Sequence, residues 1–135
     1  FLVSADNAHA IHPNHPEFAD PTNAPVMGQG IVLKHNASLS YCTDGVSAAL
    51  FRKVCAKANV NVQTYYNRAD IPGGSTLGNI SLSHVSVPSV DIGLAQLAMH
   101  SCYETAGVKD ALYLEDAMEA YYGCTLQVDG EKYSV

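Results

Sequence analysis

Apolar and polar positions alternate along the chain in a way that predicts several strands. Two runs rich in valine, leucine and isoleucine, at 1–5 and 30–35, predict buried strands. The stretch "VNVQTYY" at 60–66 alternates with a period of two, which predicts a half-buried strand. The stretch "VPSVDIGLA" at 87–95 predicts a further extended segment. A loop rich in proline, asparagine and aspartate, 12–28, separates the first two strands.

The segment after the second strand predicts an amphipathic helix. Thr43 or Asp44 can cap its N-terminus, and the helix is expected to run to about Ala58. A period of 3.6 residues gives the helix one apolar and one basic face. The predicted apolar face contains Val46, Ala49, Leu50 and Val54, and the predicted basic face contains Arg52, Lys53 and Lys57.

Two further helices complete the pattern. The glycine-rich turn "IPGGSTLGN" is expected to open a short helix through about His84, and a last helix is predicted at 107–122. Strands that alternate with helices indicate the α/β class, in which functional groups lie in loops at the ends of strands. A weaker alternation at 125–128 indicates one more short strand.

Composition and charge exclude two classes of partner. The chain has 135 residues, 47% of them hydrophobic, which fits one modest globular domain. The formal net charge is −6, and the seven Lys and Arg residues are scattered, so a nucleic-acid partner is not expected. No apolar run approaches the roughly 20 residues that span a bilayer, so no membrane partner is expected either.

Four widely spaced cysteines bear on the cellular compartment. Cys42, Cys55, Cys102 and Cys124 form no Cys-x-x-Cys pair, which favours buried free thiols and a reducing compartment, the cytoplasm. The alternative is a secreted protein with disulfides. The glycosylation triplets at Asn36 and Asn79 would support this alternative. Such triplets are common by chance, so the cytoplasm is the expectation.

The candidate chemistry lies directly after two apolar runs. In "SADNAHAIHPNH" Asp6 follows the first strand and His9 comes three residues later, and in "LAQLAMHS" His100 follows another strand-like run. Carboxylate and imidazole groups that a sheet brings together from distant segments are typical zinc ligands. Two ligands do not complete a zinc site.

Each of these residues also has a purely structural interpretation. His12 and His15 adjoin proline and asparagine, so we interpret them as turn residues that bind local backbone groups. For Asp6, an Asx-turn or helix cap is as good an interpretation as a metal ligand when spacing alone is considered. The stretch "GGSTLG" lacks the lysine of a phosphate-binding loop, which favours a turn followed by a helix start.

Four motifs together resemble one family. "SADNAHAIHPNH", "GIVLKHNASLSY", "DIPGGSTLGNI" and "VPSVDIGLAQLAMHSCYETAG" look like the C-terminal half of the catalytic domain of the aspartyl aminopeptidase and aminopeptidase I family. Their order and intervals agree over about residues 1–121. The resemblance implies a mixed β-sheet flanked by helices, in the catalytic domain of a dinuclear zinc exopeptidase. The tail after Tyr122 has no counterpart in this resemblance.

The resemblance also implies roles for individual residues. Asp6 and His100 would each bind one of two zinc ions per complete active site, and His9 would lie beside the substrate and stabilise the oxyanion. A lysine in a partly closed pocket suits an acidic side chain at the N-terminus of a peptide. The residues that resemble substrate-binding positions are Lys34, Tyr41, Gly73, Gly74, Ser75, Thr76 and Met99.

Several parts of such an enzyme have no counterpart here. In the family, the N-terminal half supplies further zinc ligands and the general base, and an inserted domain supports oligomers. The chain also begins at Phe1 inside a strand-like run, so we expect a fragment that is inactive alone and needs the missing N-terminal half. We expect a homo-oligomeric aminopeptidase acting on peptides, aspartyl and glutamyl ones by preference. The alternative is a non-catalytic half-domain that folds or self-associates without hydrolysis.

Overall fold

A four-stranded sheet forms the centre of the computed structural model, which describes residues 1–135. Its strands lie in the order β1-β5-β3-β4, with β1 parallel to β5, β3 parallel to β4, and β3 antiparallel to β5. The expected mixed sheet is therefore confirmed. The bounds are β1 Leu2–Ala5, β3 Ile31–His35, β4 Val62–Tyr66 and β5 Ser89–Gly93.

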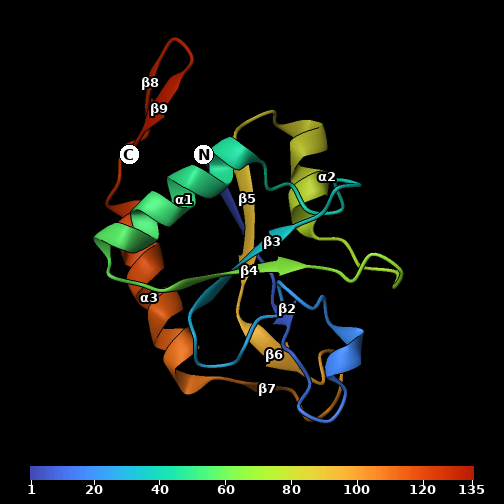
Figure 1. Cartoon of the computed structure of the whole chain (residues 1–135). Helices are drawn as coiled ribbons and strands as arrows, with labels where there is room; N and C mark the ends of the chain where they lie inside the picture. The colour runs from blue at the N-terminus through green and yellow to red at the C-terminus, as the bar shows by residue number, and fades with distance from the viewer.

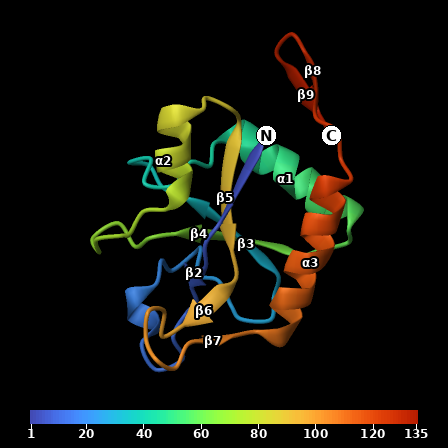
Figure 2. The same cartoon turned by 180° about the vertical axis from the view of Figure 1, so that it is seen from behind.

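Helices cover both faces of this sheet (Figures 1 and 2). Helices α1 (Gly45–Lys57) and α3 (Val108–Tyr122) pack together on one face, and α2 (Leu77–His84) packs on the other against β1 and β5. Residues of β3 alternate between the two layers, as a strand must. Ile31 and Leu33 join the core under α1 and α3, whereas Val32 joins a smaller cluster on the other face.

Helix α1 begins where the sequence indicates, but its buried face agrees only in part with the predicted one, since Leu50 and Val54 are buried as expected and the other two residues are not. The Asp44 side chain accepts a hydrogen bond from the Ser47 backbone N–H, and the Ser47 hydroxyl accepts one from the Asp44 backbone N–H, a capping box. The pattern predicts Val46 on the apolar face, yet it is 44% exposed. Ala49 of the same predicted face is also exposed. The buried side chains are Ser47, Ala48, Leu50, Phe51, Val54 and Cys55.

A second small sheet extends the strands beyond the main one. Strand β2 (Ala8–His9) runs parallel to β6 (Ala95–Leu97), and β6 is antiparallel to β7 (Thr105–Ala106). Between the two sheets the chain crosses very close to itself at Gly93. A Cβ on Gly93 would lie 2.1 Å from the Asp6 carbonyl oxygen, so only glycine fits there. This crossing holds Asp6 at the point where β1 ends.

The remaining elements lie at the periphery. A single 3-10 turn, Pro16–Phe18, lies in the long loop after β2, and a hairpin of β8 (Gln127–Asp129) and β9 (Lys132–Ser134) projects from the molecule (Figure 1). All four cysteines are free, as expected, but only Cys55 is fully buried and Cys102 is exposed. None of the three helices is long and apolar enough to cross a membrane.

Candidate functional site

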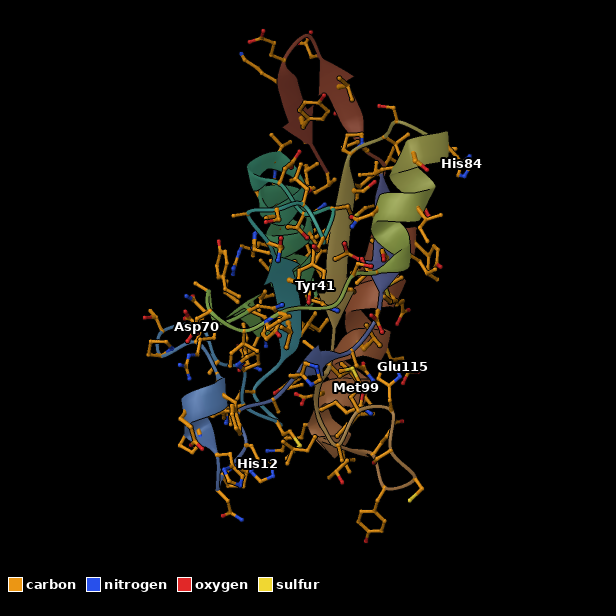
Figure 3. The ribbon with its side chains drawn as sticks, turned by 90° about the vertical axis from the view of Figure 1, so that its right-hand side faces the viewer. His12, Tyr41, Asp70, His84, Met99 and Glu115 are labelled. Atoms are coloured by element: carbon orange, nitrogen blue, oxygen red, sulfur yellow. The ribbon has the colours of Figure 1, made fainter.

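A cavity of about 100 Å³ opens where β1 ends, and it collects most of the predicted site residues. Six separate stretches of the chain form its lining. Figure 3 shows two of its residues, Tyr41 beside the central strands and Met99 on the loop after β6. The predicted residues that line this site cavity are Asp6, His9, Lys34, Tyr41, Gly74, Ser75, Met99 and His100. Gly73 and Thr76 do not line it.

Asp6 lies directly after β1 with its side chain half exposed, 54%, at the site cavity. Its backbone N–H still donates to the Ile92 carbonyl, which continues the pairing of β1 with β5 by one residue. The next residue, Asn7, bonds through its side chain to Gln96 and to the Leu94 backbone. Asp6 is therefore fixed in its backbone while its carboxylate remains accessible to a ligand.

Lys34 is the most buried charged group of the site cavity, with only 3% of the residue exposed. Its Nζ donates to the Asp6 carbonyl at 3.3 Å, to the Asp6 carboxylate at 3.4 Å and to the Asn7 carbonyl at 3.1 Å. It also lies 4.6 Å from the centre of the Tyr41 ring, a cation–π contact. Burial lowers the pKa of Lys34, and the Asp6 carboxylate opposes this shift.

His9 of β2 lines the site cavity together with Asp6 and Lys34. Burial lowers its pKa first, and the nearby Lys34 and His100 lower it further, whereas Asp6 raises it. Because the ordinary pKa of histidine is already about 6.5, a lowered value leaves the ring neutral at pH 7. A neutral imidazole has one N–H to donate and one nitrogen that accepts.

His100 and Met99 reach the site cavity from a strained loop after β6. Ala98 and His100 have positive φ angles of 55° and 68°, in the left-handed region that non-glycine residues rarely adopt. The Glu104 carboxylate accepts a hydrogen bond of 2.7 Å from the His100 backbone N–H. Strain of this kind is retained where the surrounding structure enforces it, often at functional sites.

The glycine-rich turn before α2 supports the site cavity from one side. Gly73 packs directly against the Asn67 side chain, where a Cβ would collide with the amide. Asn67 accepts a 3.4 Å hydrogen bond from the Tyr41 hydroxyl, so the turn steadies the Tyr41 ring. Gly74 has open space where a side chain would be. Thr76, at the N-cap of α2, is buried and its hydroxyl has no partner.

The donor set available for a metal is partial. Asp6 and His100 are of the types that bind zinc, and both line the same cavity. No group of three or more His, Cys, Asp or Glu residues in the chain comes together in a way that could hold a metal ion. Asp6 and His100 alone are therefore too few to hold a metal ion.

Sequence reasoning did not identify several residues of the site. Tyr65 lines the cavity because β4 pairs with β3 in a register that places it opposite Lys34. That register could not be read from the alternation of 60–66. Asn7 accepts a hydrogen bond from the Leu94 backbone N–H, and Glu104 accepts one from the His100 backbone N–H. Their nearness in sequence to the two predicted ligands is the signal that could have found them.

An α/β sheet with a carboxylate and an imidazole converging at its strand ends defines a candidate metallohydrolase site. The family described as aminopeptidase I zinc metalloprotease (M18) matches residues 1–122. The chain belongs to this M18 family, which confirms the resemblance found in its motifs.

Individual relatives agree with this assignment. The chain is 47% identical over 122 residues to "Probable M18 family aminopeptidase 2" of Clostridium novyi, covering 90% of this chain and 28% of that protein. A chain in the cryo-EM structure of the Ape4 and Nbr1 complex superposes with a TM-score of 0.88 at 37% identity, covering 90% and 23% of the two chains. The mApe1 dodecamer of S. cerevisiae gives 0.75 at 28% identity, with coverages of 90% and 26%. The chain thus spans under a third of the length of these relatives.

Proposed function

We propose that this chain forms part of the active site of a zinc aminopeptidase that removes N-terminal residues from peptides, aspartate and glutamate by preference. The observation that carries the proposal is the shared cavity of Asp6, His100 and Lys34, which joins two zinc-type donors to a buried ammonium group. Family membership supports the reaction class. The four free cysteines support a reducing compartment such as the cytoplasm.

In this proposal Asp6 and His100 would each hold one of two zinc ions. Bound zinc polarises a scissile carbonyl and lowers the pKa of a bound water. The neutral imidazole of His9 can donate a hydrogen bond to the peptide oxygen on which negative charge develops. The remaining zinc ligands and the general base would come from outside this chain, since no group of three His, Cys, Asp or Glu residues in the chain is placed to hold a metal ion.

The preference for acidic residues would rest on Lys34 and on the size of the site cavity. About 100 Å³ suits one short side chain. A carboxylate that enters this space can replace the 3.4 Å contact between the buried Lys34 ammonium and the Asp6 carboxylate, and a charge-assisted hydrogen bond of this kind is strong. Tyr41 keeps the ammonium in place from the other side.

The isolated chain tests the proposal directly. We expect the pure 135-residue chain to bind zinc weakly in calorimetric titration, because two donors give little chelation. We also expect it to release no N-terminal residue from aspartyl chromogenic peptides, whereas the complete protein that carries this chain should do so in a chelator-sensitive manner. Robust turnover by the pure chain would show that the catalytic groups are misassigned. A complete protein without any aminopeptidase activity would refute the function.

The isolated chain should also self-associate. Strand β1 is an edge of the main sheet, so one side of its backbone lacks a partner strand. Ile80 of the adjacent α2 adds exposed apolar surface. Light scattering over a range of concentrations should therefore show dimers or larger species.

A matched pair of variants tests whether the surface formed by β1 and α2 causes the self-association. Ile80→Asp should shift the chain toward monomer, whereas Val128→Asp on the projecting hairpin, a similarly exposed position, should not. A stable monomer at all concentrations would indicate that the chain is a complete fold of its own. The structural neighbour mApe1 of S. cerevisiae is a dodecamer, which supports an oligomeric enzyme as part of this proposal.

A further inference from the structure

A second cavity of about 320 Å³ adjoins the site cavity. His9, Tyr65 and Gly74 line both, so these residues form the common wall. The other walls come from the loop after β2 with its 3-10 turn, the end of β4, the turn before α2 and the end of β6. Figure 3 shows His12 and Asp70 on the two loops that approach each other on this side of the molecule.

The polar side chains of this second cavity are already engaged with one another or with the backbone. His15 pairs with Glu17 at 3.0 Å, and Arg68 pairs with Asp70 at 2.7 Å. Asp20 accepts hydrogen bonds from the Thr22 and Asn23 backbone.

The side chains of His12 and Gln96, which also line the second cavity, are engaged in contacts within the protein as well. The His12 ring accepts a hydrogen bond from the Asn14 backbone N–H and packs on the His15 ring at 5.4 Å. Gln96 accepts a hydrogen bond from the Asn7 side chain. The second cavity therefore has one carboxylate without a cationic partner, Asp20, and most of its exposed lining is apolar, with Phe18, Tyr66, Ile71 and Leu97 among the residues that form it.

We propose that the second cavity receives the side chain of the second residue of the peptide, the one that follows the cleaved bond, and that it selects large aliphatic or aromatic residues there. This inference rests on the proposed function, because it places the first residue in the site cavity. A peptide that continues from that cavity across the common wall enters the second cavity. Gly74 leaves open space at this wall, which gives the peptide backbone room to pass.

The size of the expected effect follows from burial of apolar surface. Moving a phenylalanine side chain from water into an apolar cavity should favour a peptide beginning Asp-Phe over one beginning Asp-Gly by about 10-fold to 100-fold in kcat/KM. A peptide beginning Asp-Lys should be cleaved less well than the phenylalanine peptide, because an apolar lining stabilises a charged side chain less than an aromatic one.

The experiment compares these three peptides, identical after the second residue, on the complete aminopeptidase that carries this chain. Phe18→Ala and Ile71→Ala should each reduce the phenylalanine-to-glycine ratio several-fold and leave the rate on the glycine peptide nearly unchanged. Phe18 is 63% exposed on a short turn, so its truncation should not impair folding. Leu112→Ala, a 57% exposed leucine on α3 away from both cavities, is the matched control and should leave the ratio unchanged.

The outcomes separate the two proposals. If no peptide is cleaved, the proposed function falls, and the inference falls with it. If all three peptides are cleaved at similar rates, or if the lysine peptide is preferred, the function stands and the inference is overturned. If one variant fails to fold, the ratio of the unaltered enzyme and the other variant still decide the question.

Discussion

Replacing Asp6 by asparagine in the complete aminopeptidase is expected to lower kcat/KM by about 10³-fold on every peptide. A neutral amide binds zinc far more weakly than a carboxylate, and loss of metal removes several kcal/mol of stabilisation from the transition state. At about 1.36 kcal/mol for each factor of ten, a loss of about 4 kcal/mol gives this magnitude. Zinc content of the purified variant, measured by atomic absorption, should fall in parallel.

The change should leave the fold intact, because the Asp6 side chain is half exposed and asparagine can still accept a hydrogen bond from Lys34. Asp129→Asn, in the hairpin outside the family match, is the control and should keep full activity and full zinc content. An Asp6→Asn enzyme with normal zinc and normal rates would show that this carboxylate has only a structural role at the strand end.

Replacing Lys34 by methionine is expected to change the selectivity of the complete enzyme. Loss of the charge-assisted contact should lower kcat/KM on aspartyl and glutamyl peptides by about 10-fold to 100-fold more than on neutral peptides. The structure adds a second consequence. The carbonyl oxygens of Asp6 and Asn7 lose their donor, so a smaller loss common to all peptides should accompany the change in selectivity.

The ratio of the two kcat/KM values separates these contributions. If both classes of peptide lose activity equally, Lys34 only positions Asp6, and acidic selectivity must be sought elsewhere. Lys53→Met, on the exposed side of α1, controls for the loss of one positive charge and should change neither value. Thermal unfolding of both variants shows whether the Lys34 change also weakens the fold.

The extent to which the sequence predicted the fold differs from element to element. The capping signal at Asp44 determined the start of α1 because it depends on residues only three apart. The buried face of the same helix was predicted only in part, with Leu50 and Val54 correct, since apolar residues occur all around the helix. Phe51 is buried and Val46 is exposed because α1 packs against the sheet and α3. The sequence does not show these contacts.

The site shows the same division. The ends of apolar runs identified Asp6 and His100, because strand ends in α/β proteins place polar groups at one edge. Lys34 could be either a solvated lysine or a pocket lysine by pattern alone. Only the pairing of β3 with its neighbours, and the close crossing at Gly93, brought the Asp6 and Asn7 carbonyls to its ammonium group.

The sequence by itself determined the class of fold, the positions of most helices and strands, and through its motifs the family. These properties depend on local spacing, on capping and on short runs of residues, which remain visible along the chain. The tertiary structure alone decided the burial of Lys34, the contribution of Tyr65 and the second cavity beside His9. Each of these depends on contacts between segments that lie tens of residues apart, and strand register and loop packing determine such contacts.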